Sequence, residues 1–284
     1  MMTYGKAAYG GISVPMPRWT NIVIPCLAIL AANTACAGEG KEEIPPAPVY
    51  ELNPVVDVPV FFLAGVVAVG WLLGDELGEA DCAPLCDRRD VNSFDRWSAG
   101  YYDENWARVT DFTLLGIMGV GVVSLFIDEG FKAGLVDLFV VAESVLLANA
   151  FVVALNLMAR RPRPYLYSTE APLDVRNSGT ASLSFGSGHV AATTSFTTAV
   201  FGVFHARHPD SPWPWVFLGV GTAASGVVAA GRIMSGRHFM SDVIIGGVSG
   251  ICLGILVPAM HKKNVIVAPT IIDSGAGLAM TRSF

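Results

Sequence analysis

The chain has 284 residues, of which 52% are hydrophobic and only 15% are charged. Soluble domains carry about 25% charged residues, so this composition excludes a water-soluble globular protein and places the chain in a lipid bilayer. The formal net charge of -6 comes without a long basic tract, which argues against a nucleic-acid partner.

The chain begins with a segment typical of a secretory signal peptide. Lys6 and Arg18 precede the apolar stretch NIVIPCLAILAANTACAG, and Ala35-Cys36-Ala37 has the small-x-small form of a leader peptidase site. We therefore expect residues 1–37 to be a signal peptide or an N-terminal hydrophobic segment. Residues 38–54 are charged and rich in proline, which predicts a linker.

Six apolar segments follow the linker, and each is predicted to be a transmembrane helix. Several hold only about 15 to 18 apolar residues, near the lower limit for crossing a bilayer, but their number and regular spacing strengthen the prediction. The expected fold is all-α, a polytopic six-helix transmembrane bundle over residues 55–261, preceded by the signal-like segment and followed by a C-terminal tail of residues 262–284. The six segments are residues 58–73, 112–127, 138–159, 190–204, 213–230 and 243–260.

Two of these segments carry residues that predict contacts inside the bundle. Gly246, Gly250 and Gly254 recur at four-residue intervals in the last segment, and such a stripe lets a neighbouring helix approach closely. Glu143 lies inside the third segment, where an ionised acid is costly unless it is paired. The sequence does not identify its partner.

The longest polar loop, residues 74–111, holds two of the five cysteines, Cys82 and Cys86. A zinc site there would need two more ligands close by, and none is evident in the sequence. We expect a short disulfide in an oxidising compartment, with two unpaired surface thiols as the alternative.

Three polar clusters interrupt the second half of the chain: NLMARRPRP at residues 156–164, SFGSGH at 184–189 and GRIMSGRHFMSD at 231–242. The first cluster ends the third predicted span and the second cluster starts the fourth. The last cluster joins the end of the fifth span to the start of the sixth, and two membrane crossings separate it from the others. All three clusters are therefore expected on one membrane face. Arginines beside a span often only anchor it at the headgroups, but together with histidines, an aspartate and a Gly-rich helix start they predict a site for a phosphate-like dianion.

Two local patterns indicate the chemistry of these clusters. His238 and Asp242 are four residues apart, so on a helix they share a face, and the carboxylate can accept the Nδ1 proton and leave Nε2 as a nucleophile or base. Ser187 and Gly188 directly precede a helix expected to begin near His189, where backbone N–H groups and the helix dipole favour an anion. Solvated interfacial residues and a flexible helix start are the respective alternatives.

Together the clusters resemble the signature of the type 2 phosphatidic acid phosphatase and vanadium haloperoxidase superfamily. That signature has a Lys, six residues and Arg-Pro, then Pro-Ser-Gly-His, then Ser-Arg, five residues, His, three residues and Asp. In this sequence Arg163-Pro164 fills the first part, Ser187-Gly188-His189 the second, and Arg232, His238 and Asp242 the third. Three positions depart from the pattern, since Asn156, Gly186 and Gly231 stand where the family has Lys, Pro and Ser.

The resemblance implies a metal-independent phosphatase that needs no cofactor. His238 would attack phosphorus and form a phosphohistidine, Asp242 would orient its ring, and His189 would protonate the leaving alcohol and later activate water. Asn156 in place of Lys removes a phosphate-binding cation, which lowers the expected rate. The residues expected to bind the phosphate are Asn156, Arg161, Arg163, Ser187, Gly188 and Arg232.

The membrane spans favour a lipid phosphate or diphosphate as the substrate, without indicating which lipid. Two alternatives stay open: a vanadate-dependent haloperoxidase, and a non-catalytic lipid-phosphate binder or transporter. The resemblance and the expected disulfide place the site on the periplasmic face of a bacterial inner membrane, whereas a cleaved leader followed by six spans would place it in the cytoplasm. The sequence indicates no oligomeric state.

Overall fold

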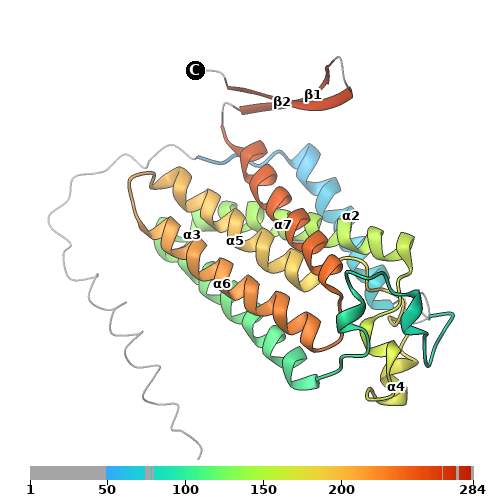
Figure 1. Ribbon diagram of the computed structural model, residues 1–284. Helices are drawn as coiled ribbons and strands as arrows, with labels where there is room; N and C mark the ends of the chain where they lie inside the picture. Colours follow the sequence, from blue (N-terminus) through green and yellow to red (C-terminus); the bar gives the residue numbers. More distant parts are fainter. Residues whose placement is uncertain (1–48, 74–77, 79, 264, 273–274, 283–284) are drawn as a thin grey trace, which may run out of the picture. The chain divides into compact units, whose positions relative to one another are not determined.

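The computed structural model describes residues 49–73, 78, 80–263, 265–272 and 275–282 (Figure 1). The predicted signal peptide, residues 1–37, lies outside the described residues, as do residues 38–48 of the predicted linker.

Helices make up most of the described chain, and every predicted span falls on one of them. Apolar runs form helices in a membrane because a helix satisfies its own backbone hydrogen bonds. The helices are α2 (Pro54–Leu73), α3 (Glu104–Ala159), the short α4 (Leu173–Arg176), α5 (Gly188–Arg207), α6 (Trp213–Met234) and α7 (Met240–His261). Short 3-10 helices lie at Arg88–Asp90, Arg96–Ser98 and Pro164–Tyr167.

Helix α3 contains two of the predicted spans because it is interrupted at Gly130. This residue has a φ of 73° and a ψ of -175°, a conformation that glycine adopts readily and residues with a side chain do not. Beyond the break, a Cβ on Gly134 would lie 2.9 Å from the carbonyl oxygen of Leu125, so the chain folds back closely on itself. The two arms lie in separate candidate spans, Glu104–Asp128 and Gly130–Tyr167, and the second span continues past the end of α3 to the 3-10 helix Pro164–Tyr167.

Four of the described helical segments are long and apolar enough to cross a membrane: the two arms of α3, α6 and α7. Helix α5 is not among them, and it carries serine and threonine through its centre. Helix α2 offers only a shorter apolar stretch, Asp57–Val67. The structure therefore supports an integral membrane protein with four membrane-length helices, and the count of six spans stays a prediction.

The glycine stripe of α7 packs against α5, as the sequence predicted. In Figure 1 the two helices lie side by side. This packing fixes the start of α5 against the start of α7. Cβ atoms on Gly246, Gly250 and Gly254 would each lie 2.5 Å from a backbone oxygen, those of Ser187, Ala191 and Ser195.

The C-terminal segment differs from the expectation of a helical protein with a simple tail. Strands β1 (Val265–Ile272) and β2 (Gly275–Arg282) pair antiparallel, with Val265 opposite Arg282 and Ile272 opposite Gly275. The β1 sequence VIVAPTII is rich in β-branched residues, which favour strands. The bundle is helical as expected, but the fold extends beyond the all-α class at this end.

The polar loop between α2 and α3 ends earlier than expected and packs onto the bundle. The carboxylate of Asp103 accepts the N–H of Asn105 at 2.8 Å, and this cap starts α3 at Glu104 instead of residue 112. The predicted disulfide joins Cys82 to Cys86. The loop therefore covers the end of the bundle where α3 ends and α7 begins, because its buried residues Cys86, Val91 and Ala99 pack with Tyr165, Leu166 and Phe239.

Candidate active site

The three polar clusters meet at one end of the bundle, as the sequence predicted. The N–H of Ser187 donates to the carbonyl oxygen of Asp242 at 3.0 Å, which joins the start of α5 to the start of α7. Nη1 of Arg163 donates to the carbonyl oxygen of Arg237 at 3.5 Å, which joins the segment after α3 to the loop between α6 and α7. Residues far apart in the sequence therefore form one site.

His238 lies in the loop between α6 and α7 and is only 4% exposed. Its Nδ1 is 2.9 Å from the backbone carbonyl oxygen of Ser184. Because a carbonyl only accepts, Nδ1 carries the proton and Nε2 holds the lone pair. Burial, together with the positive charges of Arg163 and Arg232, lowers the pKa of His238 well below its ordinary 6.5. The ring is therefore neutral at physiological pH and presents a nucleophilic Nε2.

The expectation that Asp242 orients the His238 ring is wrong. Helix α7 begins at Met240, so His238 precedes the helix and does not share a helical face with Asp242. Asp242 instead caps α7: its Oδ2 accepts the N–H of Phe239 at 2.8 Å and the hydroxyl of Ser184 at 2.6 Å. Asp242 thus positions the Ser184 segment, and the Ser184 carbonyl in turn sets the His238 tautomer.

Arg163 and Arg232 are both buried, and both keep their positive charge largely uncompensated. Nε of Arg163 donates to the carbonyl oxygen of Thr180 at 2.9 Å, a neutral partner. Nη1 of Arg232 lies 3.9 Å from Oδ1 of Asp111, beyond hydrogen-bond distance. Nε of Arg232 is buried and has no hydrogen-bond partner among the described residues. Two buried cations with an unused donor can bind an anion.

The start of α5 offers further donors. Its first-turn N–H groups, on residues 188–190, have no acceptor within the helix, because an α-helix leaves its first N–H groups unpaired. The N–H of Ser187 is already donated to Asp242, but its buried hydroxyl has no partner within the described part of the chain. Gly186 has a φ of 95°, which the proline of the family signature cannot adopt. The loop therefore reaches the helix start by a path that requires glycine.

Asn156 contacts backbone in this structure, which differs from the expectation that it binds phosphate. It is 3% exposed, and its Nδ2 donates to the carbonyl oxygens of Val152 at 3.1 Å and Gly186 at 3.3 Å. Both amide hydrogens are therefore used, and the buried Oδ1 has no partner among the residues described. Asn156 fastens the Gly-rich loop to α3.

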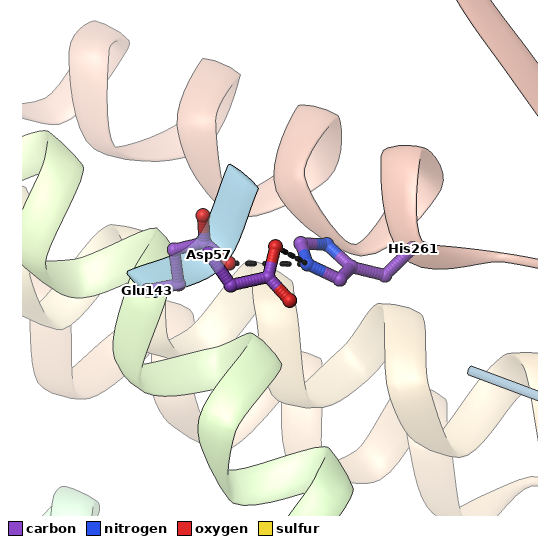
Figure 2. Close-up of side chains that lie close together, drawn as sticks. All are labelled: Asp57, Glu143 and His261. Carbon is purple, nitrogen blue, oxygen red and sulfur yellow. Dashed lines mark hydrogen bonds and ion pairs between the residues drawn. The ribbon is translucent and has the colours of Figure 1, made fainter. Parts of the chain in front are cut away.

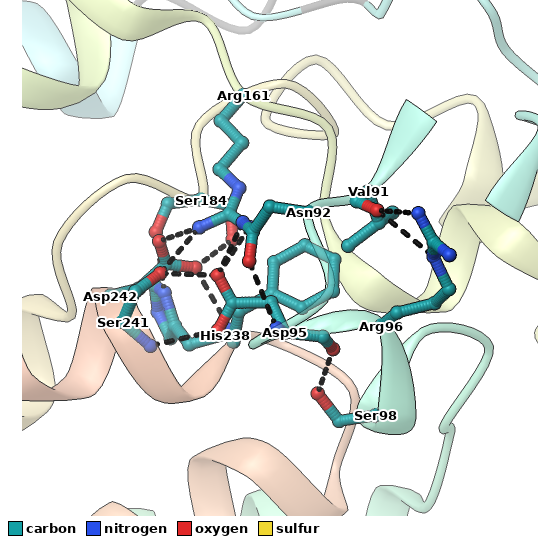
Figure 3. Close-up of polar contacts among 11 residues, drawn as sticks. Val91, Asn92, Asp95, Arg96, Ser98, Arg161, Ser184, His238, Ser241 and Asp242 are labelled. Atoms are coloured by element: carbon teal, nitrogen blue, oxygen red, sulfur yellow. Dashed lines mark hydrogen bonds and ion pairs between the residues drawn. The ribbon is translucent and has the colours of Figure 1, made fainter. Parts of the chain in front are cut away.

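Arg161 lies between two buried carboxylates (Figure 3). Nη1 donates to Oδ1 of Asp242 at 2.7 Å, and Nη2 donates to Oδ2 of Asp95 at 2.8 Å. Nη1 also donates to Oγ of Ser241 at 2.7 Å, and the guanidinium lies 4.1 Å from the centre of the Phe239 ring. Two carboxylates already compensate the charge of Arg161 in this structure, and the expectation that it binds phosphate stays a prediction.

Asp95 is a member of this network that the sequence analysis missed. Its carboxylate accepts the hydroxyl of Ser241 at 2.6 Å and Nδ2 of Asn92 at 2.9 Å. Burial alone would raise the pKa of Asp95, but these hydrogen bonds and the one from Arg161 outweigh burial and lower it. Asp95 stands in the polar loop far from any cluster, so no local pattern marked it.

His189, in the first turn of α5, pairs with a second residue that the sequence analysis missed. Its Nε2 lies 2.9 Å from Oδ1 of Asp111, and both side chains are partly exposed. Asp111 was assigned to the polar loop, but the early start of α3 places it on that helix. Burial and the positive charge of Arg232 lower the pKa of His189 to about 4, although Asp111 opposes this shift. The ring is therefore neutral in this structure, and Asp111 is the group that can stabilise its protonated form.

A comparison with protein families finds a match for the part of the chain that holds the site. Residues 137–266, which contain all three clusters, match the PAP2 superfamily. A solved transmembrane PAP2 type phosphatidylglycerolphosphate phosphatase from Bacillus subtilis is similar at 21% identity with a TM-score of 0.40, over 71% of this chain and 93% of that chain. With a score this low, the likeness supports no conclusion about this chain. No curated protein matches it.

Proposed function

Because residues 137–266 match the PAP2 superfamily, we propose that the chain is a member of this superfamily, an integral membrane phosphatase that hydrolyses a lipid phosphate or diphosphate. One observation carries the proposal. The neutral His238 presents Nε2 in a buried site with Arg163 and Arg232, where donors on Arg232 and Ser187 have no partner among the described residues. These are the groups that a phosphoryl anion needs.

In the proposed reaction, the Nε2 lone pair of His238 forms a bond to phosphorus while the bond from phosphorus to the leaving oxygen breaks. The Nδ1 proton stays on the ring, where the Ser184 carbonyl stabilises the positive charge of the phosphohistidine. His189 takes up a proton when the negative charge of the substrate phosphate offsets that of Arg232, and it then protonates the leaving oxygen while Asp111 stabilises the ring. Water then attacks the phosphohistidine, gives a proton to His189 and releases inorganic phosphate.

Arg163, Arg232, the Ser187 hydroxyl and the first-turn N–H groups of α5 hold the phosphoryl oxygens in this proposal. They stabilise the charge that these oxygens carry in the transition state. The reaction uses no metal ion and no cofactor.

The contacts of Asn156 favour a second candidate function, a non-catalytic lipid-phosphate binder or transporter. Where the family signature has a lysine, this chain has an amide whose hydrogens are used by Val152 and Gly186. Such a site lacks one cation that would strengthen its interaction with phosphate in the transition state. A binder would hold lipid phosphate and release none.

The test uses the full-length protein in detergent with EDTA, a lipid monophosphate and a lipid diphosphate. We expect release of inorganic phosphate that is lost in His238→Ala and retained in His208→Ala, a control at the other end of α5. A phosphorylated intermediate of the native protein should be acid-labile, as a phosphohistidine is. Release that stops with EDTA and returns with magnesium would contradict the proposal. Lipid binding without release would favour the binder, and bromide oxidation after addition of vanadate would favour a haloperoxidase.

We further propose that the site faces the periplasm of a bacterial inner membrane. The loop with the Cys82–Cys86 disulfide packs at the same end of the bundle as the site, and disulfides persist in oxidising compartments. The start of α2 and the end of α7 lie together at the other end, where Tyr50 pairs with Lys262. A periplasmic site therefore requires that this other end face the cytoplasm.

An impermeant thiol reagent tests the sidedness. In intact cells of a Cys252→Ser variant, Cys82 should be labelled after reduction, and only then. The Cys252 substitution removes an exposed thiol of α7 that would complicate the reading. Protection of Cys82 until the cells are lysed would place the site in the cytoplasm.

A further inference from the structure

A second cluster of ionisable side chains lies at the end of the bundle opposite to the candidate active site (Figure 2). Asp57 from α2, Glu143 from α3 and His261 at the end of α7 point toward one another. Asp57 and Glu143 are 7% and 3% exposed. This cluster supplies the partner of Glu143 that the sequence did not identify.

The orientation of His261 places a lone pair toward both carboxylates. Its Nδ1 lies 2.9 Å from the carbonyl oxygen of Val257, so Nδ1 donates and a neutral ring has its lone pair on Nε2. Nε2 is 3.2 Å from Oδ1 of Asp57 and 3.1 Å from Oε2 of Glu143. A lone pair and two carboxylate oxygens repel one another unless a positive charge lies among them.

One oxygen of each carboxylate faces Nε2 of His261: a protonated ring would donate to Asp57, and a neutral ring would leave a place for a cation among the three atoms. Oε2 of Glu143 is buried and close to His261, yet it forms no hydrogen bond with any described residue. The other oxygen of Asp57, Oδ2, accepts the N–H of Asn53 at 2.7 Å, which fixes the carboxylate and directs Oδ1 toward the cluster. The backbone contacts of Asp57 and His261 are those that orient metal ligands.

We propose that Asp57, Glu143 and His261 bind a divalent transition metal ion, with zinc as the best fit. One imidazole nitrogen and two carboxylate oxygens are a common ligand set for zinc, with water as the fourth ligand. Tetrahedral ligands at about 2.1 Å from zinc are about 3.4 Å apart. The three ligand atoms lie within 4.8 Å of one another, and two of their separations are 3.1 and 3.2 Å. Small movements of the carboxylates would complete the site.

The ion would fasten α2 to α3 and α7 and would take no part in catalysis. Helix α7 has 22 residues between the two sites, and at 1.5 Å per residue this is about 33 Å. Asp57 lies in the first turn of α2, so the ion would hold the point at which the chain enters the bundle. Evidence against the proposed phosphatase reaction would therefore not count against this metal site, and evidence against the metal site would not count against the reaction.

The test uses full-length protein in detergent, stripped with EDTA, exchanged into buffer and titrated with zinc. We expect about one zinc per chain and a Tm that rises by several degrees, because a ligand that binds only the folded state stabilises it. His261→Gln and Glu143→Gln should weaken zinc binding by about 100-fold or more. His208→Gln, which removes another His–carboxylate pair, should bind zinc like the native protein. Phosphate release by the native protein should be the same with EDTA and with zinc.

Three results would overturn the proposal. The first is that the native protein binds no more zinc than His261→Gln does. The second is that zinc raises the Tm of both proteins equally, and the third is that the Tm depends on pH and not on zinc. The last result would mean that a protonated His261 bridges the carboxylates. If His261→Gln does not fold, Asp57→Asn takes its place, and the visible absorption of bound cobalt reports whether the native ligands surround the ion.

Discussion

Replacing Arg161 tests whether this residue stabilises the fold or binds phosphate. Arg161→Met keeps an unbranched apolar side chain, but removes both ion pairs and the contact of the guanidinium with the Phe239 ring. In the structure these pairs, at 2.7 and 2.8 Å, lead to two carboxylates with fully buried side chains. We therefore expect the substitution to destabilise the fold, and to affect phosphate binding only indirectly.

The size of the effect follows from what each carboxylate retains. Removing one partner of a buried ion pair costs about 3 to 5 kcal/mol. Asp242 keeps the Ser184 hydroxyl and the Phe239 N–H, and Asp95 keeps donors from Ser241 and Asn92. With these donors in place, and with 18% of the Arg161 side chain exposed, we expect about 3 kcal/mol, the lower end of that range.

Thermal unfolding in detergent, followed by tryptophan fluorescence, measures this loss. A cost of about 3 kcal/mol corresponds to a fall in Tm of about 6 to 12 °C on the scale of soluble domains of similar size. Asp95→Asn in the Arg161→Met background should recover part of the loss, because it removes one of the unpaired charges. An unchanged Tm together with a large increase in KM for lipid phosphate would refute this reasoning and return Arg161 to the phosphate pocket.

Three further predictions test the site. Asn156→Lys should raise kcat/KM for a lipid phosphate by about tenfold, because it adds a charged donor worth about 1.4 kcal/mol to a pocket in which Asn156 itself donates only to backbone carbonyls. A rate equal to that of Asn156→Gln would contradict this. Gly246→Ala should lower activity, because the new Cβ would lie 2.5 Å from the Ser187 carbonyl oxygen. Gly247→Ala should not, because its Cβ would lie 3.7 Å from a Val190 methyl group. Equal activities of the two variants would count against the importance of the contact between Gly246 and Ser187. The pKa of His238 is held well below 6.5, so protonation inactivates the nucleophile only at lower pH. We therefore expect that kcat/KM for a substrate with a good leaving group does not fall as the pH decreases from 7.5 to 6.5. A fall centred near pH 6.5 that tracks His238 would show an ordinary, solvated imidazole.

Much of the fold is encoded in short stretches of sequence. Apolar runs predicted all the long helices, because an apolar stretch of sufficient length has to form a helix in a bilayer. The Gly246, Gly250 and Gly254 stripe predicted a close helix neighbour, which is α5. The ends of helices were less accurate, since the polar first turns of α3 look like a loop until Asp103 is seen to cap them. The hairpin of β1 and β2 was missed because the segment was read only as a tail.

The sequence likewise predicted one part of the candidate site and not the other. Chain crossings alone were enough to bring Arg163, Ser187, Arg232 and His238 to one end of the bundle, because a span reverses the side of the membrane at which its residues emerge. The chain crossings do not predict the partner of each side chain. His238 takes its tautomer from the Ser184 carbonyl and not from Asp242, although the spacing of His238 and Asp242 suggested that they pair.

What only the tertiary structure decided was which charges meet. Arg161 binds Asp95, 66 residues away, and Glu143 meets His261 and Asp57 across three helices. No periodicity or motif records such pairs, because they depend on distances of a few ångströms between elements that the chain brings together only on folding. Coulomb interactions between buried charges vary steeply over those distances, so the sequence determined which charged residues lie at each end of the bundle, and the packing of the helices determined what each one does there.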